Sequence, residues 1–385
     1  MSPTISTLWR VAPASVGLAA AVALSACGNG SSSPTTTTTT HVSSSNVATS
    51  LSQLEKPPSG TVALTEDGSS LLYPLYESWV SAFHKVDPHF SSTSGADGSG
   101  TGISDAESGT TVLGASDAYL PTATFKQYPT IENIPMAISA QMINYNLPGM
   151  TSTHLKLDGT VIAEMYEGKI TNWDASALAK LNPGVKLPDL KVIPVHRSDS
   201  SGDSFLFTSY LADSDPGSFA GRAGPSVLPT WPNVSTALAA KGNSGMVQTC
   251  GATKGCIAYI GISYKSDTTA AHLGEAMLDN RSGHYELPTA MTIHAEAAAF
   301  SSIPSNGAIS LIDGPASSGY PIINFEYIVT KTNQSSTVGA GVKAFLAWCV
   351  DPKHGNSASF LAPVNFQPLP SGALKVSLTL IKKVS

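Results

Sequence analysis

Short strand-like runs alternate with longer helical runs from about residue 58 to the end of the sequence. In the first helical run, LLYPLYESWVSAFHKV, large apolar side chains recur at helical spacing from Leu72 to Phe83. The run TVAL precedes it, and KVIPVHR and YPIINFEYIVT are typical of further strands. This alternation predicts an α/β fold in which helices cover mixed sheets.

Three turns of Gly, Ser and Asp share one pattern, in which a strand precedes the turn and an apolar helical run follows it. They are DGSS at 67–70, DGSGTG at 97–102 and DSSGD at 199–203. The first N–H groups of a helix are unpaired and carry partial positive charge, so a helix start can hold an anion. Any one of these turns could equally be an ordinary helix cap. Together, with Arg197 beside the third, they predict a convergent anion site.

Two carboxylates near these turns bear on which anion is selected. Asp117 follows a strand end in GASDAYL, and Asp203 lies inside the third turn. A buried carboxylate beside a fully ionised anion is costly, but the contact becomes favourable when the anion keeps a proton to donate. Phosphate keeps a proton at neutral pH and sulfate does not, so a carboxylate in the site predicts selection of phosphate.

Each of these polar residues also has a structural interpretation. Asp117 could be a turn or cap residue, and Asp203 could interact with the dipole of the helix that follows it. Arg197 could simply pair with an aspartate. Within an anion site, that pairing would also hold the acceptor in place.

The charge content narrows the choice of partner. The chain has 385 residues, of which 12% are charged, and its formal net charge is -6. Nucleic acid requires a basic surface, and no cluster of Lys and Arg occurs in the sequence, so nucleic acid is excluded as a partner. The hydrophobic content of 42% allows a sizeable core, and the length predicts two globular units after processing.

The N-terminus predicts export and lipid anchoring. Arg10 precedes an apolar run over 11–24, which is too short for a comfortable membrane span, and Leu-Ser-Ala then leads into Cys27. We expect residues 1–26 to be a lipoprotein signal peptide and Cys27 to be lipidated, with palmitate among its acyl chains. A plain signal peptide with an incidental Cys27 is the alternative. Residues 27–57 are Ser/Thr-rich with few large apolar side chains, which predicts a disordered stalk with or without attached sugars.

The other cysteines have different expected roles. Cys250 and Cys256 flank the turn-prone insert Gly-Ala-Thr-Lys-Gly, and an exported protein meets an oxidising compartment, so we expect a disulfide between them. Zinc binding is the alternative for this pair. Cys349 lies on the apolar helical run AFLAWCV, which predicts a buried thiol.

From about residue 60 to the end, the sequence resembles the phosphate-binding protein of the high-affinity phosphate ABC importer, the PstS family, and especially its actinobacterial lipoprotein branch. The resemblance is carried by many segments, among them GSSLLYPLYESW, GSGTGISDA, GASDAYL, AISAQMINYNLPG, HLKLDGTVIAEMYEGKITNWD, LNPGVKLP, HRSDSSGDSFLFTSYL, CIAYIGIS and LIDGPASSGYPIINFEY.

The resemblance implies a two-lobed, hinged periplasmic-binding-protein (Venus-flytrap) fold that closes on phosphate and delivers it to an ABC permease. Lobe I would comprise residues 58–137 and 320–385, and lobe II residues 138–319. The hinge would be a pair of crossing strands near ISAQMINYN and YPIINFEY. We expect an exported monomer, held at the outer face of the cytoplasmic membrane by its lipid anchor alone.

Carried over position by position, the family's phosphate contacts fall on residues of all three turns and on the carboxylate between them. These are Ser70, the Leu71 backbone, Ser99, Asp117, Arg197, Ser201, Gly202 and Asp203. Many members of the family have Thr at the position of Asp203, whereas the lipoprotein branch has Asp. A second acidic acceptor leads us to expect that Asp203 favours monobasic phosphate at acidic pH.

A serine esterase is the main alternative function. Gly202-Asp203-Ser204-Phe205 resembles the GDS(L/F) signature, with Ser204 as nucleophile, and Asp351 and His354 have the D-x-x-H spacing of that family's acid and base. The serine would come mid-chain instead of after the first strand, so we expect a binding protein and not an enzyme.

An adhesin or structural surface protein would leave the three turns without a role. The histidines show no zinc-type pairing, so we expect neither a metal site nor a cofactor.

Overall fold

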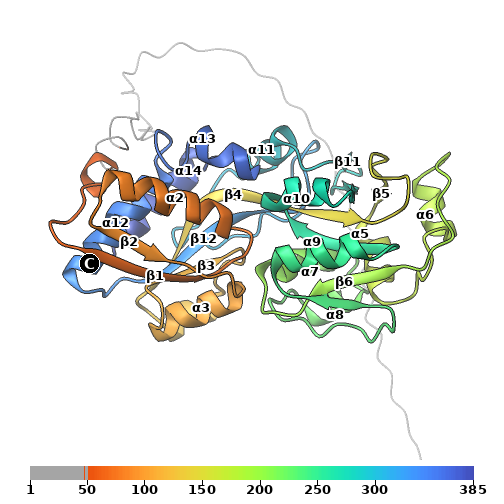
Figure 1. Cartoon of the computed structure of the whole chain (residues 1–385), viewed down its shortest axis with the longest axis horizontal. Helices are drawn as coiled ribbons and strands as arrows, with labels where there is room; N and C mark the ends of the chain where they lie inside the picture. Colours follow the sequence, from red (N-terminus) through yellow and green to blue (C-terminus); the bar gives the residue numbers. More distant parts are fainter. Residues whose placement is uncertain (1–46, 48–50) are drawn as a thin grey trace, which may run out of the picture. The chain divides into compact units, whose positions relative to one another are not determined.

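One long strand, β4 (Ile131–Tyr145), connects two groups of strands in the computed structural model, which describes residues 47 and 51–385 (Figure 1). Its first part, up to Ala140, pairs antiparallel with β12 (Ile323–Lys331), and its last part, from Gln141, pairs antiparallel with β8 (Cys256–Gly261). The strand therefore changes neighbours between Ala140 and Gln141. The nine-stranded sheet has the order β2-β1-β3-β12-β4-β8-β6-β7, with β9 (Gly274–Glu275) also paired to β4.

The first group of strands contains three parallel strands beside β12. They are β1 (Val62–Gly68), β2 (Phe90–Thr93) and β3 (Leu113–Ser116). The helices of this half are α2 (Tyr73–Val86), α3 (Ser99–Ser108), α4 (Thr122–Gln127), α12 (Ser336–Val350), α13 (Ala358–Leu361) and α14 (Ser371–Ile381), with a 3-10 turn η2 (Ala362–Val364). In Figure 1, α3 lies below these strands and α2 above them.

The second group places β8 and β6 (Ile193–Arg197) in parallel, followed by β7 (Leu238–Ala240). A separate three-stranded sheet joins β5 (Lys156–Leu157), β10 (Met277–Asp279) and β11 (Tyr285–Glu286). The helices of this half are α5 (Gly159–Tyr166), α6 (Ser176–Leu181), α7 (Gly202–Ser214), α8 (Phe219–Ala223), α9 (Gly242–Ala252), α10 (Lys265–Ala270) and α11 (Ala290–Ala298), with a 3-10 turn η1 (Ile262–Tyr264). The α/β fold with mixed sheets and covering helices is thus confirmed.

The helical spacing expected over the first apolar run is also confirmed. Helix α2 buries Leu75, Tyr76, Trp79 and Phe83, and the ring of Phe83 packs edge-on against Phe90 of β2. Such aromatic pairs contribute beyond the area they bury. Helix α2, which follows β1 and the first Gly/Ser turn, is therefore held against the sheet.

The disulfide expected from the sequence is present. Cys250 near the end of α9 and Cys256 at the start of β8 are bonded, and their Cα atoms are 5.4 Å apart. Cys349 is a free, buried thiol on α12. The bond joins the last turn of α9 directly to the first residue of β8.

The end of the predicted stalk differs from the expectation. Leu51 is only 5% exposed and packs into the core, residues 51–54 are helical, and the side chain of Glu55 contacts His354. Leu51 and Leu54 provide apolar side chains that can be buried, which the Ser/Thr-rich residues before them lack. Folded structure therefore begins before residue 58. The signal peptide, Cys27 and the stalk up to residue 46 lie outside the described residues, as do residues 48–50.

The described helices include none with the length and hydropathy required to cross a bilayer.

Helix α3 approaches the sheet more closely than a side chain would allow. A Cβ added to Gly102 would lie 2.5 Å from the backbone oxygen of Asp67 and 2.7 Å from that of Ala115. These atoms are backbone, so they cannot rotate away. A glycine is therefore required where α3 crosses the ends of β1 and β3.

We predict that Gly102→Ala lowers the free energy of unfolding by about 1–3 kcal/mol, because the added methyl group forces α3 away from two strand ends. Urea unfolding measures this change. Gly372→Ala is the matched control, since Gly372 is an exposed residue near the start of α14 with no atom within 4 Å of an added Cβ. An equal effect of the two substitutions would contradict the close approach of α3.

Candidate anion-binding site

The first predicted turn connects β1 to α2 and lies in the interior. Ser69 and Ser70 are buried, and Leu71 is fully buried with its carbonyl oxygen accepting a hydrogen bond from Ser263 Oγ at 2.8 Å. Ser69 Oγ accepts from the N–H of Leu72 at 2.9 Å and donates to Asp117 Oδ1. The turn is thereby joined to the carboxylate that follows β3.

The second turn leads into α3, whose first residue is Ser99. Gly98 precedes the helix with φ 104, a conformation that favours glycine, and its N–H donates to the carbonyl of Gly68 in the first turn at 2.8 Å. Ser99 Oγ accepts from the N–H of Asp117 at 3.1 Å. Asp117 is thus bonded to both the first and the second turn.

The third turn connects β6 to α7 and is organised by Arg197. The Arg197 guanidinium is buried, and its Nη1 donates to Asp203 Oδ2 at 2.6 Å while its Nε donates to Asp199 Oδ1 at 2.8 Å. Ser201 caps α7 by accepting from the N–H of Ser204 at 3.4 Å. The ion pair fixes the carboxylate of Asp203 at the start of the helix.

The three turns meet. A Cβ added to Gly202 would lie 2.5 Å from both Asp117 Oδ2 and Ser99 Oγ, so these two side chains point at the start of α7. The N–H of Gly100 donates to the carbonyl of Ser200 at 2.9 Å. The convergence expected from the sequence is therefore observed for the second and third turns and for Asp117.

A fourth helix start, that of α9, joins the same site, and our sequence analysis missed it. Asn243 Nδ2 donates to Ser70 Oγ at 3.0 Å and to Asp203 Oδ2 at 2.7 Å, so this side chain connects the first turn to the third. Gly242 before it has φ +65. The sequence GNSG at 242–245 has the same Gly/Ser composition as the other turns, so this helix start could have been recognised.

Two further contributors come from the strand that connects the halves and from its neighbour. Gln141 Nε2 on β4 donates to the backbone oxygen of Asp203 at 2.8 Å and to its Oδ1 at 3.1 Å. Glu326 on β12 lies against Asp117. Neither residue belongs to a turn motif, and only the tertiary pairing of the strands brings them here.

The site has more acidic than basic groups. Burial raises the pKa of Asp117 to about 7, and repulsion from Asp203 adds to the increase, while hydrogen bonds from Ser69 and Glu326 and the charge of Arg197 oppose it. Burial also raises the pKa of Asp203, against the opposing charge of Arg197. The pKa of Asp199 is lowered by Arg197 despite its burial. Such a site favours an anion that brings a proton of its own.

The residues of the esterase alternative do not come together. Ser204 is buried and its Oγ is hydrogen-bonded to the hydroxyl of Tyr259 at 2.7 Å. His354 Nδ1 instead faces Glu55 Oε1 at 3.3 Å and Asp351 Oδ2 at 3.5 Å. Within residues 51–385, Ser204 has no hydrogen bond to a histidine, so the general base that a serine nucleophile needs is missing. The esterase interpretation is wrong.

Glu55, Asp351 and His354 are the described residues whose ligand atoms lie close enough together to hold a metal ion. They lie at the end of the predicted stalk, where Glu55 contacts the segment that follows α12.

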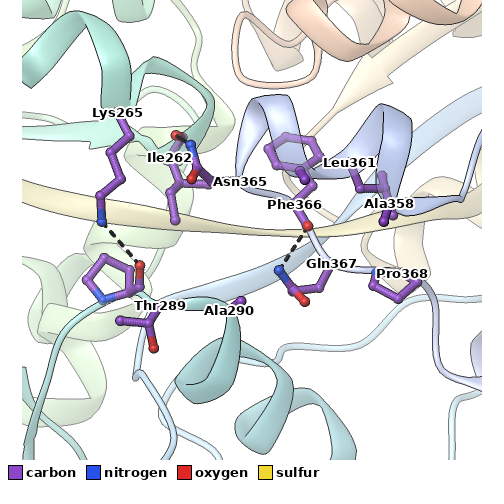
Figure 2. Close-up of a pocket in the computed structure, with 12 residues that line it drawn as sticks. Ile262, Lys265, Thr289, Ala290, Ala358, Leu361, Asn365, Phe366, Gln367 and Pro368 are labelled. Atoms are coloured by element: carbon purple, nitrogen blue, oxygen red, sulfur yellow. Dashed lines mark hydrogen bonds between the residues drawn. The ribbon is translucent and has the colours of Figure 1, made fainter.

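A cavity of about 520 Å³ lies elsewhere in the molecule (Figure 2). It is lined by Ile262 and Lys265 from one side and by Leu361 and Phe366 from the other, and the ammonium group of Lys265 is bonded to the carbonyl of Pro288. None of the predicted anion-contacting residues lines it.

Comparisons with known proteins identify the family of this chain. The model of the PBP superfamily domain matches residues 31–353. The phosphate-binding protein PstS of Pasteurella multocida is 30% identical over 315 residues, covering 81% of this chain and 88% of that protein. The phosphate-binding protein PstS3 of Mycobacterium bovis (strain BCG / Pasteur 1173P2) is also 30% identical, covering 93% and 94% of the two chains.

Solved structures share the fold at lower identity. An ancestral soluble variant of the human phosphate-binding protein matches with a TM-score of 0.65 at 17% identity, covering 84% of this chain and 98% of that one. An ABC-type phosphate transport receptor from Vibrio cholerae matches with a TM-score of 0.52 at 17% identity, covering 80% and 100%. The two-domain α/β fold expected from the resemblance is therefore confirmed. With a PBP superfamily domain over most of its length and relatives at 30% identity over nearly their whole length, this chain belongs to the PstS family of phosphate-binding proteins.

Proposed function

We propose that this protein binds inorganic phosphate outside the cytoplasm and delivers it to the permease of a phosphate ABC importer. The observation that carries the proposal is the convergence of helix starts around Asp117, Arg197 and Asp203. Unpaired N–H groups and hydroxyls bind the oxygens of an anion without a cluster of cations. The family to which the chain belongs supports the same ligand.

In this proposal the donors and acceptors have separate roles. The phosphate oxygens accept hydrogen bonds from Ser70, Ser99, Arg197 and Ser201 and from the backbone N–H groups of two residues, Leu71 and Gly202. Asp117 and Asp203 accept the protons that phosphate carries.

The hydrogen-bonding capacity of Asp203 supports its role as an acceptor. A carboxylate accepts about four hydrogen bonds. Asp203 receives bonds from Arg197, Asn243 and Gln141, which leaves one position on Oδ1 for a ligand proton. Asp203 then adds to the preference for monobasic phosphate at acidic pH, as we inferred from the sequence.

We also propose that lobe I comprises residues 58–137 and 320–385 and that lobe II comprises residues 138–319. The segment from Leu51 to residue 57 packs on lobe I. The change of neighbours within β4 between Ala140 and Gln141 supports a boundary in this region. The contacts Gly100–Ser200 and Ser70–Asn243 then join one lobe to the other at the ligand. Closure on phosphate brings donors from both lobes to one anion.

We further propose that residues 1–26 are removed and that lipidation of Cys27, with palmitate among its acyl chains, anchors a monomer to the outer face of the cytoplasmic membrane. The tripeptide Leu-Ser-Ala before Cys27 supports this processing, and the Ser/Thr-rich residues that follow would act as a tether.

We predict that Cys27→Ala abolishes labelling by radioactive palmitate and releases the protein from the membrane fraction into the soluble exported fraction. Labelling and fractionation of the producing cells measure both effects. Cys349→Ala is the control, because Cys349 is buried and has no role in processing. Retention of label by the Cys27 variant would contradict the anchor.

We predict that phosphate binds at least about 10⁴-fold more tightly than sulfate, because sulfate offers no proton to the buried carboxylates. Isothermal calorimetry with sulfate and arsenate as competitors measures this ratio. Arsenate should compete, since it keeps protons as phosphate does. Equal binding of sulfate would overturn the proposed function, and phosphate affinity that stays unchanged from mildly acidic to mildly alkaline pH would contradict the role of Asp203.

We predict that Asp117→Asn lowers the preference for phosphate over sulfate by about tenfold or more, because an amide can donate to an unprotonated anion. The same variant should be more stable than the wild type without ligand at alkaline pH. With its pKa raised to about 7, Asp117 binds more protons in the folded than in the unfolded chain between about pH 4 and 7, so wild-type stability falls as pH rises through that window.

Thermal unfolding at several pH values measures the second effect. The advantage of Asp117→Asn should shrink toward acidic pH, where the wild-type carboxyl is protonated. Asp105→Asn, a half-buried residue of α3 outside the site, is the control and should change neither selectivity nor this pH dependence. An Asp117 variant as selective and as pH-sensitive as the wild type would show that Asp117 does not face the ligand.

A further inference from the structure

Glu326 lies directly behind Asp117, in the middle of strand β12. It is fully buried. Tyr327 pairs with Ser116 in the antiparallel register of β12 and β3, which places Glu326 opposite the residue after Ser116, Asp117. The register of β12 against β4 shifts between Glu326 and Tyr327, an irregularity of the kind that redirects side chains.

The two oxygens of Glu326 have different surroundings. Oε1 accepts from Ser139 Oγ at 2.5 Å and from Asn324 Nδ2 at 3.0 Å. Oε2 is buried and receives no N–H or O–H donor from the described part of the chain. The carboxyl of Asp117 lies beside Glu326, because the same Asn324 Nδ2 that donates to Glu326 also donates to the backbone oxygen of Asp117 at 3.3 Å, and the two carboxyls interact.

Two ionised carboxylates have only acceptors, so they cannot bond to each other unless one of them keeps a proton. No ion pair among the described residues includes Glu326, and Arg197, the arginine of the site, is already bonded to Asp199 and Asp203. An unpaired charge at full burial is far more costly than a neutral acid. The proton therefore belongs between Glu326 and Asp117.

We propose that Glu326 is a positioning residue that stays protonated and donates a hydrogen bond to Asp117, which keeps Asp117 an acceptor for the proton of the ligand. This inference rests on the proposed binding of phosphate. Asp117 then accepts from Ser69 and Glu326 and still has capacity for the ligand, because a carboxylate accepts about four hydrogen bonds.

The electrostatics of the pair agree with this assignment of the proton. Burial, and then the charge of Asp117, raise the pKa of Glu326 well above its usual range. The pKa of Asp117, whose charged neighbours are Asp203, Arg197 and Glu326, rises only to about 7. Asp117 thus loses its proton before Glu326 does, and the hydrogen bond from Glu326 makes that loss easier.

The test compares Glu326→Leu, which removes the donor, with Glu326→Gln, whose amide can donate to Asp117 as a protonated acid does. Calorimetry with inorganic phosphate on the purified full chain across pH gives the readout. We expect Glu326→Leu to weaken binding about tenfold to a hundredfold at neutral pH, with a smaller loss at alkaline pH, where Asp117 ionises without help. Glu326→Gln should restore both the affinity and the pH profile.

Glu132→Gln is the matched control. Glu132 lies on β4 in the same half of the fold, its carboxylate pairs with Lys383, and it takes no part in the site. It should leave the pH profile of phosphate binding unchanged. Infrared difference spectra between the ligand-free wild type and Glu326→Gln provide a second readout. At alkaline pH the variant should lack one C=O band of a buried protonated acid, while other buried acids with a raised pKa, such as Glu66, contribute equally to both proteins.

Two results would overturn the inference. Tighter phosphate binding by Glu326→Gln than by the wild type would show that Glu326 is ionised, because the amide would then remove a negative charge behind the anion. A difference spectrum in which Glu326→Gln loses no protonated-acid band would place the proton elsewhere. The infrared readout needs neither ligand nor the leucine variant, so it tests the proton on Glu326 even if phosphate fails to bind or that variant fails to fold.

Discussion

The site depends on the buried ion pair between Arg197 and the carboxylates of Asp203 and Asp199. The guanidinium lies at the end of β6, and the two aspartates lie on either side of the third turn, so the pair holds the start of α7 against the strand. Loss of one partner would leave a buried charge uncompensated, which typically costs 3–5 kcal/mol. Every other contact of Asp203, with Asn243 and with Gln141, requires that the carboxylate stay where Arg197 holds it.

This ion pair also determines how the site can attract an anion. Arg197 is already shared by two carboxylates, and Asp117 adds a third acidic group, so net positive charge is not available for a ligand. Helix starts and hydroxyls provide the remaining attraction as oriented dipoles. Dipoles bind a phosphate and a sulfate alike, whereas carboxylates accept only from an anion that carries a proton. In the proposed function, the carboxylates that neutralise Arg197 are therefore also the groups that select a protonated anion.

The parts of the site that could be predicted from sequence are those that lie on contiguous turns. Ser99, Arg197 and Gly202 each belong to a short motif whose local geometry is nearly independent of the rest of the chain. Gln141 and Glu326 could not be found this way, because their roles depend on how β4 and β12 pair with other strands. The fold class followed from the alternation of strands and helices. The start of the folded part could not be predicted. Its only signal is the apolar pair Leu51 and Leu54, which lies inside a polar tract.

The position of Glu326 explains how a buried acidic site can exist in a stable fold. Three carboxyls, of Asp117, Asp203 and Glu326, are buried near one arginine, and ionising all of them would be prohibitively unfavourable. A proton kept by Glu326 removes one charge without removing a hydrogen bond, since the neutral acid donates where the carboxylate would repel. Asp117, with a pKa of about 7, can then lose its proton near neutral pH and serve as an acceptor. The selectivity of the site therefore depends on a strand residue that does not touch the ligand, and β12, on which it lies, is the neighbour of the strand that links the two halves of the fold.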